Sequence, residues 1–181
     1  LNIAGMSFFY AINHSMSNIA TGGFSTKNDS LSSWNSMPQI QYIIIFFIIL
    51  AGTNFLLIYL SLVGKFKKLF YNTEFIWFLG LIASFVLITT IILNSNVDLD
   101  STNFNHPQVL GKLEASFRHA LFQVVAIITT TGFVTGDFAA WTPFLTMLFF
   151  GLMFIGASSG STSGGIKISR HLILCLLYTS P

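Results

Sequence analysis

The chain has 181 residues, of which 53% are hydrophobic, 15% aromatic and only 8% charged. A soluble domain carries roughly 25% charged residues, so this chain has too little charge to cover a surface in water. The net charge of +2 does not favour nucleic acid as a partner, and the single cysteine, Cys175, excludes an internal disulfide or a cysteine metal cluster. Leu1 is no start residue and no secretory leader follows it, so we expect an internal segment of a longer membrane protein.

The first elements are a short helix ending near Ile19 and a Thr/Gly segment, ATGGFST, at residues 20–26. Trp34 suits a membrane interface, and Pro38 suits the start of a helix. Residues 39–63 then form an apolar run long enough to cross a bilayer as one helix, which takes about 20 residues. The alternative is a core helix of a soluble protein. It is less favoured because parts of the run have no polar face to turn toward water.

A short basic segment at residues 64–73, with three lysines, separates this run from a second predicted span at residues 75–93. The following residues, 94–111, carry Asp98 and Asp100 and no lysine or arginine. By the positive-inside rule, the lysine segment is expected in the cytoplasm and the acidic segment outside.

Two later apolar runs are too short to span. Residues 115–128 predict a helix of about 21 Å and residues 141–155 one of about 22 Å, against a hydrocarbon core of roughly 30 Å. Irregular backbone at membrane depth is tolerated only where protein or a water-filled cavity satisfies its polar groups. The two half-length helices therefore predict a pathway through the membrane.

The chain repeats itself after 109 residues. Each copy has a short helix, a Thr/Gly segment, a tryptophan, a proline and another apolar helix, which predicts a re-entrant hairpin followed by a spanning helix. The matched positions are Ser7 and Ser116, Phe8 and Phe117, Ala11 and Ala120, Ile19 and Ile128, Thr21 and Thr130, Gly23 and Gly132, Phe24 and Phe133, Thr26 and Thr135, followed at slightly different offsets by Trp34 and Trp141, Pro38 and Pro143.

The chemistry that suits such a loop is cation dehydration. Extended Thr/Gly backbone offers carbonyl oxygens in place of the water around a cation, and glycine permits carbonyl directions that other residues do not. The carboxyl end of the preceding helix adds partial negative charge. Plain glycine turns between helices are the alternative, and the repetition of the pattern makes that alternative less favoured.

Three stretches resemble the TrkH/KtrB family of potassium transporters, and more closely TrkH: residues 20–26, residues 129–137 (TTTGFVTGD) and residues 154–167 (FIGASSGSTSGGIK). The resemblance covers residues 7–170 and implies an all-α membrane fold with four helix–loop–helix repeats around one pore, as in potassium channels. It assigns residues 1–63 to the second repeat, residues 64–74 to a cytoplasmic basic loop and residues 75–181 to the third repeat. The first and fourth repeats, and a basic residue of the last membrane helix, are not in this chain.

The resemblance also implies site residues. Transported potassium would contact Thr21, Gly22, Gly23, Thr130, Thr131 and Gly132. Glycine at the key position of each loop accompanies potassium preference in the family, whereas serine accompanies sodium permeation in some plant relatives. The selectivity filter as a whole would comprise Ala20, Thr21, Gly22, Gly23, Thr129, Thr130, Thr131 and Gly132.

A Gly/Ser-rich stretch interrupts the second helix of the third repeat, and in the family it is a movable gate below the filter. A phosphate-binding loop is the rival interpretation, but Ile166 separates Gly165 from Lys167 and no strand precedes the stretch. We expect it to be non-helical, within the membrane, with helix resuming near Ile166. The predicted gate residues are Gly156, Ala157, Ser158, Ser159, Gly160, Ser161, Thr162, Ser163, Gly164 and Gly165.

The function implied is potassium uptake by a multi-pass protein of the inner (cytoplasmic) membrane, without enzymatic activity and without a cofactor other than the transported ion. The family forms homodimers and docks on cytoplasmic nucleotide-binding regulatory subunits, for which the basic loop Lys65 to Lys68 is a candidate contact. The alternatives are a sodium-permeable member of the same family and a secondary transporter of another broken-helix fold. The second alternative predicts coupling carboxylates within the membrane, and neither predicted span has one.

Several single residues carry weaker predictions. Asn54 lies within an apolar run and is predicted either to line the cavity or to bond a neighbouring helix. Asp137 either attracts cations or caps a turn, and the turn is favoured. Gly80 and Gly151 are expected to permit close helix packing. The histidines show no metal-ligand spacing, and His119 is expected to make a polar contact: His14, His106, His119 and His171. Residues 175–181 fit the family poorly and could be foreign sequence.

Overall fold

The computed structural model describes residues 1–97, 99 and 108–179, and within these residues the chain is helical, with one isolated β-bridge between Ile155 and Ile166. Asp98, Asp100 and His106, which carried predictions above, lie outside the described residues. The α-helices are α1 (Phe8–Ile19), α2 (Pro38–Ala51), α3 (Phe55–Leu62), α4 (Lys67–Phe70), α5 (Thr73–Asn96), α6 (Lys112–Ile128), α7 (Pro143–Leu152) and α8 (Ile168–Thr179), and the short 3₁₀ helices are η1 (Ser32–Trp34) and η2 (Phe138–Ala140).

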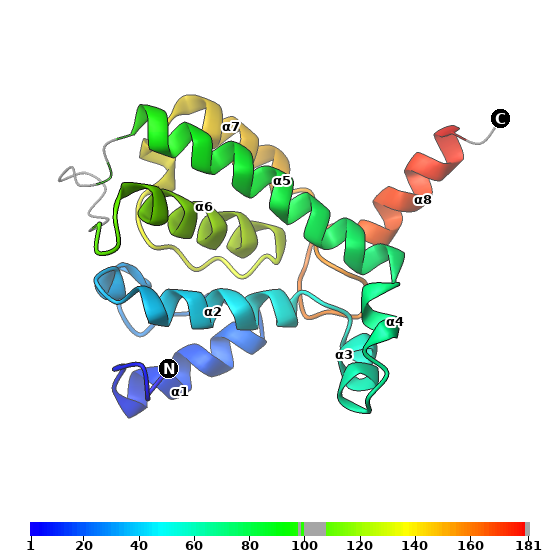
Figure 1. Ribbon diagram of the computed structural model, residues 1–181, viewed down its shortest axis with the longest axis horizontal. Helices are drawn as coiled ribbons and strands as arrows, with labels where there is room; N and C mark the ends of the chain where they lie inside the picture. Colours follow the sequence, from blue (N-terminus) through cyan, green and yellow to red (C-terminus); the bar gives the residue numbers. More distant parts are fainter. Residues whose placement is uncertain (98, 100–107, 180–181) are drawn as a thin grey trace.

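Four helices form the body of the molecule, in the spatial order α5, α6, α2 and α1 (Figure 1). The centre is α6, where twelve of seventeen residues are buried. Helices α3, α4 and α8 lie at one end, close to the loop that joins α7 to α8 (Figure 1). The buried α6 ends at Ile128, where the second Thr/Gly segment begins, so the most enclosed helix of the fold positions a predicted site.

The predicted span at residues 75–93 is confirmed as part of α5, a helix of 24 residues and about 36 Å. Asn72 caps the helix by accepting the backbone N–H of Phe75 at 3.0 Å. By length and composition, α5 is the one helix of the described chain that could cross a membrane unaided. Only 28% of its most apolar stretch is buried, so most of its apolar surface is left to lipid or to neighbouring segments.

The prediction of one continuous helix over residues 39–63 is wrong, although α2 and α3 together are long and apolar enough for one bent span. Two helices, α2 and α3, cover this stretch and bend by 105° at Gly52, Thr53 and Asn54 (Figure 1). A methyl group on Gly52 would lie 2.7 Å from Thr129 Cγ2, so the chain passes too close to the second Thr/Gly segment for a larger residue. The backbone freed by the bend is still satisfied, because Gly52 O accepts Ser158 N–H at 3.1 Å and Phe55 N–H donates to Gly160 O at 3.1 Å.

Asn54 has no hydrogen bond to a neighbouring helix among the described residues, and its other predicted role, lining the cavity, stays a prediction. Its side-chain oxygen accepts the N–H of Leu56 at 2.8 Å and caps α3, and its amide lies against Gly160. The packing role predicted for Gly80 and Gly151 is wrong within the described chain, since a methyl group on either would meet nothing within 4 Å.

The repeat predicted from the sequence is present as structure. Helices α1 and α6 end at the matched residues Ile19 and Ile128, and the matched prolines occupy the first positions of α2 and α7. The tryptophans are buried inside the fold, where Trp34 contacts His14 and Trp141 contacts Phe149 edge to face, and their position at a membrane interface stays a prediction. Helix α7 has ten residues and a length of about 15 Å, which is shorter than predicted.

Candidate functional site

The two Thr/Gly segments have the same backbone hydrogen bonds. Thr21 N–H donates to Asn18 O and Gly22 N–H to Ser17 O, and 109 residues later Thr130 N–H donates to Ile127 O and Thr131 N–H to Ala126 O, all between 2.9 and 3.1 Å. These donors close the carboxyl ends of α1 and α6. In both segments these N–H groups are therefore hydrogen-bonded to carbonyls of the preceding helix.

The sign of φ alternates in the same way in both segments. Thr21 (φ 49°) and Gly23 (φ 66°) lie in the left-handed region, as do their counterparts Thr130 (54°) and Gly132 (79°), whereas the residues between and before them do not. The two segments therefore share one unusual backbone conformation, with positive φ at every second residue. Left-handed backbone is rare for a β-branched residue, so its occurrence at both matched threonines marks a local conformation that the fold imposes.

The carbonyl oxygens of these segments are left without protein donors. Within the described part of the chain, no hydrogen bond is accepted by the carbonyls of Thr21, Gly22, Gly23, Thr130, Thr131 or Gly132. The carboxyl ends of α1 and α6 add partial negative charge beside them. Unpaired carbonyls next to two helix carboxyl ends form an electronegative region that suits a cation.

The two segments, 109 residues apart, lie against each other. A methyl group added to Gly23 would be 2.0 Å from Thr131 O and 3.1 Å from the carbonyl carbon of Gly132. In the second segment, Thr130 and Gly132 line an open groove with residues of α6, and no atom lies within 4 Å of a methyl group placed on Gly132. The fold therefore brings the two sets of predicted filter residues to one place.

The predicted gate stretch is non-helical, and helix resumes at Ile168, two residues later than predicted. Its ends are joined: Gly156 N–H donates to Ile166 O at 2.8 Å, and a methyl group on Gly156 would lie 2.4 Å from Gly164 O. The Lys167 ammonium donates to Ser163 O and to the Ser161 and Ser163 hydroxyls. Residues 156–165 therefore form a compact loop with a closed neck, which we call the gate loop.

The gate loop contacts both repeats. Gly164 N–H donates to Thr130 Oγ1 at 2.6 Å, and Thr162 Oγ1 donates to Ile19 O at 3.1 Å and to Ala51 O at 3.3 Å. On another side, Glu74 at the start of α5 accepts from the Ser159 N–H at 2.6 Å and from its hydroxyl at 2.8 Å. The loop is therefore fastened to both Thr/Gly segments and to the first turn of α5.

A buried polar network ties α6 to α2 behind the second Thr/Gly segment. The fully buried Arg118 forms an ion pair with Glu114 at 2.8 Å and donates to Gln41 Oε1. Gln41 donates to Asn35 at 2.6 Å, and Asn35 donates to Thr135 O at 2.7 Å. The network therefore ends at Thr135, just after residues 129–132, and connects this part of the second copy to Asn35 in the first copy.

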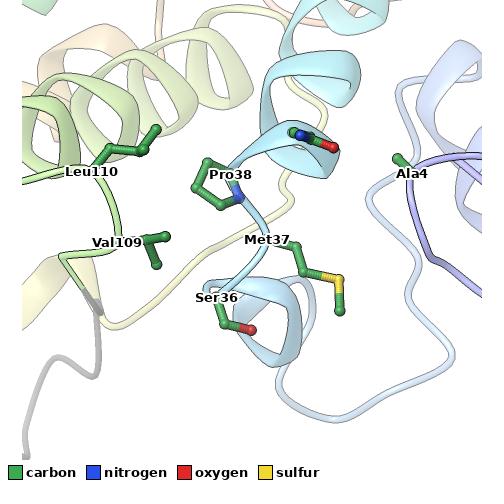
Figure 2. A pocket seen from close by; sticks show the side chains of 7 residues that line it. Ala4, Ser36, Met37, Pro38, Val109 and Leu110 are labelled. Atoms are coloured by element: carbon green, nitrogen blue, oxygen red, sulfur yellow. The ribbon is translucent and has the colours of Figure 1, made fainter.

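Other predicted residues have local roles. Asp137 caps η2 by accepting Ala139 N–H at 3.0 Å, which confirms the favoured turn. His119 makes the expected polar contact, with Nδ1 2.9 Å from Thr135 Oγ1. Figure 2 shows a mainly apolar hollow near the start of α2, in which Met37 and Pro38 lie between Ala4 and Val109; it contains none of the predicted site residues.

The sequence analysis missed Glu74, Gly52 and the Arg118 network. Glu74 lies in the first turn of α5, where an acidic residue is common because it stabilises the helix by interacting with the positive end of its dipole. The signal for the network was Gln41, a polar residue inside the apolar run of α2 whose partner lies on another helix. Such partners become visible only when the helices are placed side by side.

An all-α chain with two half-length helices, each followed by a matched Thr/Gly segment, defines a membrane protein built from pore-helix repeats. A family model described as a cation transport protein, TrkH, matches residues 3–180. The chain belongs to the TrkH family.

Individual relatives agree with this assignment. The chain is 38% identical over 172 residues to the Trk system potassium uptake protein TrkH of Salmonella typhimurium, covering 94% of this chain and 33% of that protein. It is 35% identical over 174 residues to TrkG of Escherichia coli, covering 95% of this chain and 33% of that one. The crystal structure of the potassium transporter TrkH from Vibrio parahaemolyticus superimposes with a TM-score of 0.83 at 34% identity, over 96% of this chain and 35% of that chain. The chain spans about a third of the length of the relatives it matches.

Proposed function

We propose that this chain forms part of a potassium uptake pathway in which the two Thr/Gly segments contribute backbone carbonyls to a cation filter. One observation carries the proposal: residues 20–23 and 129–132 share their φ pattern and their hydrogen bonds, and they meet in space. Among the described residues, the carbonyls of residues 21–23 and 130–132 accept no hydrogen bond, so they are available to replace the hydration oxygens of a monovalent cation. The work is transport and not catalysis, and potassium is its substrate.

Selectivity tests the filter. In the full-length protein, Gly132→Ser places a hydroxymethyl group where φ is +79° and no neighbour lies within 4 Å, so the side chain fits but the carbonyl geometry is strained. We expect weaker discrimination of potassium from sodium, measured as the ratio of their uptake rates. Gly151→Ser, in open space on α7, is the matched control and should keep the wild-type ratio.

An unchanged ratio in the Gly132 variant would remove this residue from the filter. The same assay separates the alternatives: a sodium-permeable member of the family would show little preference in the wild type. A coupled transporter of another fold would lose uptake when the driving-ion gradient is removed.

We propose further that the gate loop obstructs the pathway until it moves. Its small residues, its closed neck and its bonds to Thr130 and to the carbonyl of Ile19 place it against both Thr/Gly segments. Deleting Ser158 to Gly160 shortens the loop and removes its bonds to Gly52, Phe55 and Glu74. We expect higher ion flux and less dependence on a regulatory partner. A folded deletion variant with wild-type flux and wild-type dependence would mean that the loop is only a packing element.

Partners and location follow the same proposal. The exposed lysines of the 64–74 segment are suited to the cytoplasmic side and to contact with an anionic or acidic surface. We propose an inner-membrane protein that forms a homodimer and docks there on a cytoplasmic nucleotide-binding regulatory subunit. Co-purification of the regulatory subunit with the full-length protein tests the contact. We expect the subunit to co-purify with the wild type and not with a variant in which Lys65, Lys67 and Lys68 are replaced by glutamate.

A further inference from the structure

A single carboxylate connects the gate loop to the start of α5. Both oxygens of Glu74 are used: Oε1 accepts the Ser159 N–H at 2.6 Å and Oε2 accepts the Ser159 hydroxyl at 2.8 Å, across 85 residues of sequence. Hydrogen bonds to an ionised carboxylate are roughly twice as strong as neutral ones, and two on one residue also fix its orientation. Both residues are half-buried, which limits competition from water.

This bond differs from the other contacts of the gate loop. Thr130 and Thr162 join the loop to the Thr/Gly segments and to α2, and the contacts at Gly52 and Phe55 are backbone hydrogen bonds. Among the described residues outside 156–167, Glu74 supplies the only charged side chain that bonds the loop. The contacts of the loop with the Thr130 side chain, α1, α2 and α3 are therefore neutral, and the charged contact comes from α5.

The position of Glu74 relates the loop to the basic segment. Glu74 is the second residue of α5, two positions after Asn72, which caps the helix, and α4 with the exposed Lys67 and Lys68 precedes that cap. A displacement of residues 64–72 must move the first turn of α5, because the cap joins them. Such a displacement would lengthen or break the two hydrogen bonds between Glu74 and Ser159.

We propose that Glu74 is a positioning residue that holds the gate loop in its closed place and passes movement of the basic segment to Ser159. The inference rests on the proposed gating role of the loop. In the closed arrangement the carboxylate holds Ser159, and when α5 and the basic segment shift, the two bonds break and the loop is released.

Graded substitutions test the contact in the full-length protein. Glu74→Gln keeps the shape and one acceptor for the Ser159 N–H but loses the charge, and Glu74→Ala loses both bonds. We expect potassium flux without the regulatory partner to rise about two- to three-fold for Glu74→Gln and about ten-fold for Glu74→Ala, the larger change being on the scale of a single hydrogen bond to a charged group. Thr73→Ala, an exposed neighbour on the same turn, should match the wild type.

A combination with the loop deletion separates the two proposals. If Glu74 acts through the loop, Glu74→Ala should add nothing to the flux of the variant lacking Ser158 to Gly160. Raised flux in the deletion variant with wild-type flux in Glu74→Ala would overturn the role of Glu74 and leave the gate intact. Wild-type flux in the deletion variant would overturn the gate and this inference together. If Glu74→Ala still raises flux in the variant that lacks Ser158 to Gly160, Glu74 does not act through the gate loop, and the inference is overturned.

A cross-link decides the case in which Glu74→Ala does not fold. With the native cysteines replaced, including Cys175, the pair Glu74→Cys and Ser159→Cys should form a disulfide that lowers flux, and reductant should restore it. Each single cysteine variant serves as its own control. A cross-linked protein with unchanged flux would overturn the inference.

Discussion

Two threonines have backbone conformations that β-branched residues rarely adopt. Thr21 and Thr130 lie at φ 49° and 54°, each costing on the order of 1–3 kcal/mol, and they stand at matched positions of the repeat. Their hydroxyl groups differ: Thr21 Oγ1 donates to Ala20 O, whereas Thr130 Oγ1 accepts the Gly164 N–H of the gate loop. Both copies share the backbone conformation on which the proposed filter depends, and only the threonine hydroxyl of the second copy bonds the gate loop.

The two key glycines should respond differently to one added methyl group. In Gly23→Ala the methyl group would lie 2.0 Å from Thr131 O, so the two segments must separate. In Gly132→Ala the space is open, and the cost is the left-handed backbone, about 1–2 kcal/mol. We expect Gly23→Ala to reduce potassium uptake far more than Gly132→Ala. Uptake rates normalised to the amount of folded protein measure this, and equal losses would contradict the contact between the segments.

At the scale of elements, apolar run length predicted α5, α6 and the interruption before α8, because a bilayer and a fixed helical rise restrict length strongly. The same reasoning failed at α2 and α3. Hydropathy averages over the polar residues Thr53 and Asn54, and the bend at Gly52 depends on contacts with Thr129 and the gate loop, which are distant in sequence. The matched Thr/Gly segments could be found from the repeat, whereas Glu74 and Arg118 became recognisable only through partners on other elements.

The Arg118 network should contribute strongly to stability. Arg118→Met removes the cation that pairs with Glu114 and donates to Gln41. Breaking a fully buried pair costs about 3–5 kcal/mol, and because the Glu114 side chain is 20% exposed and keeps the Tyr42 hydroxyl at 2.9 Å, we expect a loss near or below the lower end of that range. Lys112→Met, an exposed cation at the start of the same helix, should change the free energy of unfolding by less than about 0.5 kcal/mol. Thermal unfolding of the full-length protein in detergent compares them, and similar midpoints would show that the network is not stabilising.

At the scale of the whole molecule, α3 and α4 and, apart from them, α8 lie at one end with the gate loop, and the other end carries the starts of α6 and α7, with η2 directly before α7 (Figure 1). Helix α5, about 36 Å long, separates the ends by more than the thickness of a hydrocarbon core. The basic segment and η2 should therefore lie on opposite sides of the membrane.

Cysteine labelling tests this topology. In a background without native cysteines, Lys68→Cys should react with a membrane-impermeant maleimide only after the cells are permeabilised, because lysine-rich segments remain in the cytoplasm. Ala140→Cys, exposed in η2, should react in intact cells. Labelling of both positions from the same side would contradict the arrangement.

The closed neck of the gate loop has a mechanical consequence. Gly156 and Ile166 are joined by a hydrogen bond, and Ile168 N–H, the first of α8, donates to Ala157 O at 3.3 Å. While these bonds hold, the loop cannot extend, so the movement proposed for it would be that of one body turning about its neck. A tilt of α8 would then displace residues 158–164 without unfolding them.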